Sequence, residues 1–104
     1  MITVEVSEYG IKATGHAGYA PNGEDIVCAA FTILIRVLAE RIEENVDLLC
    51  EHIIDIGPGR AVISCTPTSE NKHIIAEIFR TVTTGIDILN DEYPDYVKKI
   101  KKNI

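Results

Sequence analysis

The chain has 104 residues, of which 46% are hydrophobic and 25% charged, and its formal net charge is -6. This length suits one domain, over residues 1–104, with one hydrophobic core, and the composition excludes a disordered chain. The acidic excess argues against direct nucleic-acid binding, which needs surplus lysine and arginine, and it favours a basic partner.

The first residues lack the basic region of a signal peptide, and no apolar run approaches the roughly 20 residues that span a membrane. We therefore expect a cytoplasmic protein. The three cysteines, Cys28, Cys50 and Cys65, have no C-x-x-C spacing, which argues against a disulfide framework and a zinc ribbon. Free thiols fit a reducing compartment, and we expect neither a metal nor a cofactor.

Alternating apolar side chains predict a strand over residues 2–6 and a second over residues 11–15, so the chain opens with a hairpin. Residues 17–24 predict a loop. A helix from about Asp25 to Arg41 follows, because apolar residues recur at helical spacing: Ile26, Ala30, Ile33, Leu34, Val37 and Leu38. Further apolar residues, Val27, Phe31 and Ile35, extend this surface around most of the helix. We expect one side to pack on the sheet and the other on a second subunit.

Residues 46–56 and 60–66 flank Pro58-Gly59, which suits a type II turn and predicts a second hairpin. Residues 66–70 offer helix caps, and a second long helix extends to about Asn90. The tail from Tyr93 predicts a short edge strand. The order β-β-α-β-β-α-β predicts an α/β two-layer sandwich, with a mostly antiparallel sheet of about five strands packed by two long helices.

One stretch suggests chemistry. His16 falls at the end of the second strand, and Cys28 lies where the helix begins, with a glycine-containing loop between them. A helix N-terminus and a nearby imidazole both favour the thiolate form of cysteine, and the imidazole can carry the proton. A lone cysteine in an apolar helix is more often a small buried residue, but His16 makes the catalytic interpretation about equally strong.

The role of Asp25 has two interpretations. As the N-cap, it would accept the backbone N–H of Cys28, although its charge disfavours a neighbouring thiolate. Alternatively, it turns towards His16 and orients the imidazole. If the helix starts at Asn22 or Gly23 instead, Cys28 lies a turn deeper and His16 does more of the activation.

A rival pair is His52 and Cys65, which the register of the second hairpin places opposite each other. It has neither a helix terminus nor a glycine loop. We interpret it as a core-facing cysteine beside a partly buried histidine, and Cys50 in the same way, with three ligands at unsuitable spacing for a metal. His73 is most simply a surface residue.

Two motifs, Gly15-His16-Ala17 and Gly23-Glu24-Asp25-Ile26-Val27-Cys28-Ala29, resemble the ribosomal-processing cysteine proteases called Prp. The resemblance covers the whole domain, including the Gly-x-Gly hairpin turn and the ending Tyr93-Pro94-Asp95-Tyr96. It implies a homodimeric endopeptidase that removes a short apolar N-terminal extension from the precursor of a large-subunit ribosomal protein.

The resemblance also implies roles for single residues. Cys28 corresponds to the nucleophile and His16 to the general base and acid, while Gly15 and Asp25 match supporting motif positions. The loop that we expect to close over the substrate contains Gly18, Tyr19 and Gly23. One departure is Thr32, where the family commonly has serine; the hydroxyl is kept and a methyl group is added.

Two other functions remain open at this level. A non-catalytic dimer of the same fold that binds a basic or apolar peptide would explain the charge, but gives no reason for His16 and Cys28. Thiol-dependent amide hydrolysis on a small molecule is the other, and the short chain argues against the enclosed pocket that it favours.

Overall fold

The computed structural model describes residues 1–21 and 23–101. The elements follow the predicted order: β1 (Ile2–Ser7), β2 (Gly10–Thr14), α1 (Ile26–Glu43), a 3-10 turn η1 (Val46–Leu48), β3 (Leu49–Gly57), β4 (Arg60–Pro67), α2 (Lys72–Glu92) and β5 (Val97–Lys101). The strands form one sheet in the order β3-β4-β2-β1-β5. Neighbouring strands are antiparallel except β1 and β5, which are parallel, so the predicted mostly antiparallel sheet is confirmed.

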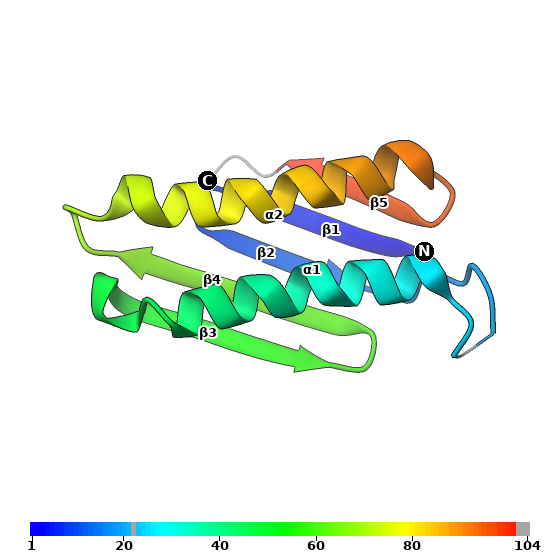
Figure 1. The fold of residues 1–104 in the computed structure, drawn as a ribbon, viewed down its shortest axis with the longest axis horizontal. Coiled ribbons are helices and arrows are strands. Elements are labelled where there is room, and N and C mark those ends of the chain that lie inside the picture. Colours follow the sequence, from blue (N-terminus) through cyan, green and yellow to red (C-terminus); the bar gives the residue numbers. More distant parts are fainter. Residues whose placement is uncertain (22, 102–104) are drawn as a thin grey trace.

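Both helices cover the same face of this sheet and run antiparallel to each other (Figure 1). They approach closely at Gly85 of α2, where a Cβ atom would lie only 2.7 Å from Leu34 Cδ2 of α1. Alternate strand residues, among them Val4, Ile11 and Ile63, point into the layer between sheet and helices and are buried. The predicted two-layer α/β sandwich is therefore the observed architecture.

The sheet buries only one stripe of the apolar surface of α1. The buried residues are Val27, Phe31, Ile35, Leu38 and Ile42. Most of the series that predicted the helix lies outside: Ile26, Ile33 and Val37 are 57%, 62% and 48% exposed. On a helix that is apolar nearly all round, several stripes have helical spacing, so the spacing does not say which stripe is buried. Contact with the sheet decides it.

The turns and helix ends follow local chemistry. Gly59 has a φ of 69°, as the second central residue of a type II turn requires. The N-cap of α2 is Asn71, beyond the expected cap residues, and its amide donates to Thr68 Oγ1 at 2.7 Å. Neither helix is long and apolar enough to cross a membrane within the described residues.

Candidate active site

Gly15 connects β2 to the loop at a point where only glycine fits. Its φ is 97°, in the left-handed region that side chains rarely adopt. A Cβ atom there would also overlap the backbone carbonyl oxygen of Met1. The Gly15 N–H donates to Gly59 O at 2.9 Å, which ties the end of β2 to the β3–β4 turn. Gly15 therefore fixes the position of the backbone from which His16 extends.

The His16 side chain is exposed and lies against the β3–β4 turn. A Cβ atom on Gly59 would be 3.0 Å from the imidazole Nε2, closer than ordinary packing allows. Gly59 is thus needed twice, for its positive φ and for the space that it leaves to the imidazole. An exposed imidazole held at one end of the sheet is accessible both to water and to a bound peptide.

Cys28 lies in the first turn of α1, as predicted, and its side chain is half-buried. Its backbone N–H donates to Asp25 Oδ1 at 2.8 Å, and its carbonyl accepts from Thr32 Oγ1 at 2.8 Å. The Thr32 hydroxyl that the chain keeps is therefore bonded to the backbone of Cys28 itself. The thiol lies where the positive end of the helix dipole acts most strongly.

Asp25 is the N-cap of α1, which decides between its two interpretations. Its second carboxylate oxygen accepts the N–H of Tyr19 at 3.0 Å, so both oxygens bind backbone amides. Desolvation of the carboxyl acts to raise its pKa, but the backbone N–H groups, with Cys28 and Tyr19 foremost, outweigh it and lower the pKa. Asp25 therefore joins the loop to the helix, and it occupies the Cys28 amide, which is then not free to polarise a substrate carbonyl.

Sequence reasoning missed what holds the loop. The Tyr19 ring makes edge-to-face contacts with Tyr93 and Tyr96, at centroid distances of 5.7 and 5.1 Å. The signal was present in the ending Tyr93-Pro94-Asp95-Tyr96, but nothing local links that segment to a loop near the other end of the chain. This tyrosine cluster (Tyr19, Tyr93 and Tyr96) fastens the loop to the connection between α2 and β5.

The two loop glycines have a conformational role. Gly18 and Gly23 have φ values of 69° and 90°, and a Cβ on either would meet nothing within 4 Å. They permit turns without creating close contacts. The alternative helix start at Asn22 lies outside the described residues, whereas Gly23 precedes the observed helix.

His16 and Cys28 thus lie at the two ends of one loop. Asp25 joins Tyr19 of this loop to Cys28, and the tyrosine cluster holds Tyr19 in place. Among residues 1–21 and 23–101, the hydrogen bonds do not include one between the His16 imidazole and the Cys28 thiol. In thiol and serine enzymes this contact is often loose and tightens when the substrate binds.

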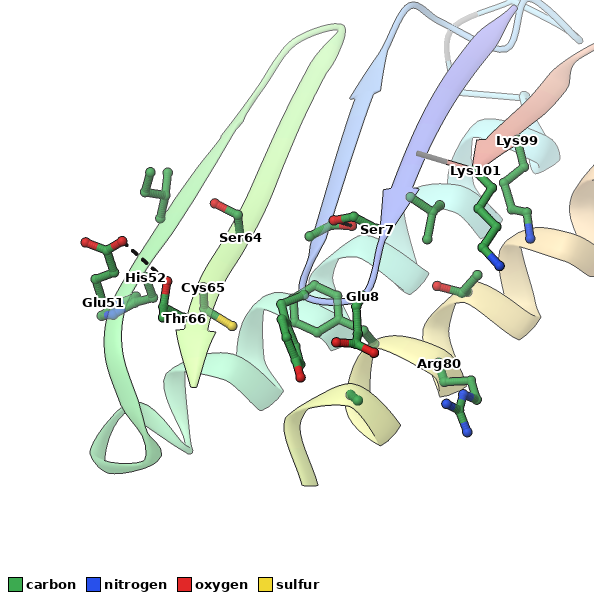
Figure 2. Close-up of a pocket in the computed structure, with 17 residues that line it drawn as sticks. Ser7, Glu8, Glu51, His52, Ser64, Cys65, Thr66, Arg80, Lys99 and Lys101 are labelled. Atoms are coloured by element: carbon green, nitrogen blue, oxygen red, sulfur yellow. Dashed lines mark hydrogen bonds between the residues drawn. The ribbon is translucent and has the colours of Figure 1, made fainter. Parts of the chain in front are cut away.

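The rival pair lies elsewhere. His52 is opposite Cys65, as the predicted register requires. Both line a groove of about 900 Å³ near the β1–β2 turn, at the other end of the sheet from His16. Figure 2 shows this groove, with Glu51 and His52 on one side and Arg80, Lys99 and Lys101 on the other.

The burial of Cys65 makes its thiol a poor nucleophile. It raises the pKa of the Cys65 thiol to about 11, so the thiol is protonated and weakly nucleophilic at neutral pH. The expectation that His52 is partly buried was wrong, and so was the expectation that Cys50 faces the core. Both are exposed because β3 is an edge strand, and Cys50 also falls at a register shift. His73 is exposed, as predicted, and the described residues contain no cluster suited to a metal ion.

Comparisons with known proteins show which family the chain belongs to. A family model described as cysteine protease Prp matches residues 1–98. The ribosomal processing cysteine protease Prp of Mycoplasma genitalium is 26% identical over 98 residues, covering 93% of this chain and 92% of that protein.

Two solved structures have the same fold. The essential ribosomal processing protease Prp from S. aureus, crystallised with a covalently linked product peptide, superposes with a TM-score of 0.82 at 21% identity, over 98% of this chain and 100% of that one. SMU.848 from Streptococcus mutans matches with a TM-score of 0.66 at 26% identity, over 97% and 93% of the two chains.

These matches define the class of the protein as a cysteine protease. Since the family model spans nearly the whole chain, the chain belongs to the cysteine protease Prp family.

Proposed function

We propose that this protein is an endopeptidase that removes a short apolar N-terminal extension from the precursor of a large-subunit ribosomal protein. The observation that carries the proposal is a half-buried thiol in the first turn of α1, at one end of a loop whose other end has an exposed imidazole. The names of the relatives, which are ribosomal processing proteases, support the substrate class. The net charge of -6 suits a basic ribosomal protein.

In the proposed mechanism, His16 takes the proton from the Cys28 thiol, and the thiolate sulfur attacks the scissile carbonyl carbon. The tetrahedral intermediate collapses to a thioester as the C–N bond breaks, and protonated His16 gives its proton to the leaving amine. A water molecule, deprotonated by the same imidazole, then adds to the thioester. The sulfur leaves and regains a proton, which restores the enzyme and releases the extension.

The supporting residues act through position. Asp25 fixes the first turn of α1 and holds the loop at Tyr19, and Thr32 binds the carbonyl of Cys28. Gly15 sets the approach of His16 to the β3–β4 turn. Because these contacts locate the base and the nucleophile separately, their loss is expected to reduce turnover more than peptide binding.

The protein is also proposed to be a cytoplasmic homodimer without cofactor, nucleic acid or membrane contact. The outward stripe on α1, formed by Ile26, Ile33 and Val37, supports the dimer because these large apolar side chains are about half or more exposed. A second copy is the simplest cover for such a stripe.

The test incubates the precursor ribosomal protein with the wild type and with Cys28→Ala, His16→Ala and Cys50→Ala, and reads fragment masses. We expect cleavage by the wild type and by Cys50→Ala, whose thiol is exposed but remote in sequence from the helix start. Cys28→Ala is expected to bind without cutting. Cleavage by Cys28→Ala refutes the mechanism, and binding without cleavage by the wild type indicates the non-catalytic module.

A further inference from the structure

β3 is an outer strand of the sheet, so one side of its backbone has no neighbouring strand in the described residues. The two-residue turn at Pro58-Gly59 makes Gly57 and Arg60 the hydrogen-bonded pair that closes the hairpin. In an antiparallel ladder such pairs alternate, so Asp55 and Ile53 bond to β4. The backbone N–H and C=O groups of His52, Ile54 and Ile56 therefore point away from the sheet.

An independent hydrogen bond agrees with this assignment. The Cys65 N–H donates to Tyr9 O at 3.0 Å, on the β2 side of β4. Since successive amides of a strand point to opposite sides, Ser64 and Thr66 point their amides towards β3. Their partners in the register are Ile53 and Glu51. The backbone N–H and C=O groups of the intervening His52 must therefore point away from β4.

The outward edge is apolar near the candidate site. Ile56 is 45% exposed and Ile54 half-buried, and both lie on the face of the sheet that the helices cover. The end of β3 that leads into β4 lies to the side of α1 and is not covered by it (Figure 1). Ile53, on the opposite face, is 57% exposed. An added strand would therefore find apolar side chains beside it on both faces.

The same edge leads to His16. β3 ends at Gly57, and the His16 imidazole fills the space beside Gly59 of the following turn, where a Cβ atom would lie 3.0 Å from Nε2. At about 3.3 Å per residue, Ile54 lies about 10 Å along the strand from Gly57. A peptide on this edge reaches the general base with only a few residues in extended conformation.

We propose that the apolar segment on the N-terminal side of the scissile bond binds as an additional strand on the free edge of β3, parallel to it. This inference rests on the proposed function, because it places the scissile bond at His16. The extension precedes the cleaved bond, so the peptide must run in the direction of β3, from His52 towards the turn. Backbone pairing supplies affinity, and the isoleucines of β3 select apolar residues at alternate positions.

The first experiment changes the edge. In a Cys28→Ala background, Ile54→Pro removes an outward N–H and Ile54→Ala keeps it, while both lose the isoleucine side chain. Proline is tolerated at an outward position of an edge strand, and thermal melting checks that both variants fold. We expect a fluorescent peptide spanning the cleavage junction to bind Ile54→Pro about tenfold more weakly than Ile54→Ala by anisotropy. Equal affinities for two folded variants overturn the proposal.

The second experiment changes the peptide and does not depend on a variant folding. Single N-methyl groups are placed at successive residues on the N-terminal side of the junction, and binding to Cys28→Ala protein is measured. A strand paired on one side loses affinity at every second position only. Uniform tolerance, or sensitivity without alternation, overturns the proposal.

The two proposals fail separately. If the wild type does not cut the unmodified peptide or the intact precursor, the proposed function fails. If it cuts them while the N-methyl series shows no alternation, only the strand on β3 fails. Alternation together with full binding by a folded Ile54→Pro variant places the peptide on another edge, and this also overturns the proposal.

Discussion

Replacing Gly15 by alanine tests whether the close approach of Gly15 to Met1 leaves no room for a side chain at the end of β2. A side chain at a φ of 97° costs about 1–2 kcal/mol. The Cβ would also overlap the Met1 carbonyl, and that backbone cannot yield freely because Ile2 is buried and its N–H is bonded to Tyr96 O at 2.9 Å. Overpacking of this kind adds about 1–3 kcal/mol, so the free energy of unfolding should fall by about 2–5 kcal/mol.

The assay is thermal unfolding followed by circular dichroism, with Gly18→Ala as the matched control. Gly18 also has a positive φ, 69°, but a Cβ there would meet nothing within 4 Å. It should therefore show the backbone strain alone. About 1 kcal/mol shifts the melting temperature of a domain this size by about 4–8 °C, so Gly15→Ala should melt at least about 8 °C below the wild type. If the two variants melt together, the close approach of Gly15 to Met1 contributes nothing and the reasoning is wrong.

Three further outcomes are expected. Tyr19→Ala should loosen the loop, because each ring contact is worth about 0.5–1.5 kcal/mol, and should speed amide exchange in the loop, whereas Tyr19→Phe, which keeps the ring, should not. In a Cys28→Ala, Cys50→Ala protein, the remaining Cys65 thiol should be alkylated slowly at neutral pH and faster as the pH rises towards about 11; rapid neutral alkylation contradicts its burial. The lowered pKa of Asp25 means that its contribution to stability is present above the ordinary carboxyl pKa and is lost as the pH falls through the lowered one. The free energy of unfolding should therefore fall less steeply towards acid pH in Asp25→Asn than in the wild type. An unchanged pH dependence would count against the role of Asp25 as N-cap.

Much of this protein was predictable from local patterns. Alternation and helical spacing predicted the element order, and Pro58-Gly59 predicted the turn that sets the pairing of His52 with Cys65. The position of Asp25 three residues before Cys28 made it a possible N-cap. Such features depend on backbone geometry over a few residues, which the amino-acid order determines directly.

Other features were decided only by contacts between distant segments. The sheet selected Val27 and Phe31 for burial and left Ile33 exposed, although all three fit helical spacing. The outer position of β3 exposed His52, and the fold brought Tyr93 and Tyr96 against Tyr19. The order of residues was enough to predict the elements and the histidine–cysteine loop. Which faces are covered, and what holds that loop, followed from the packing of distant segments, because burial depends on neighbours that no local pattern specifies.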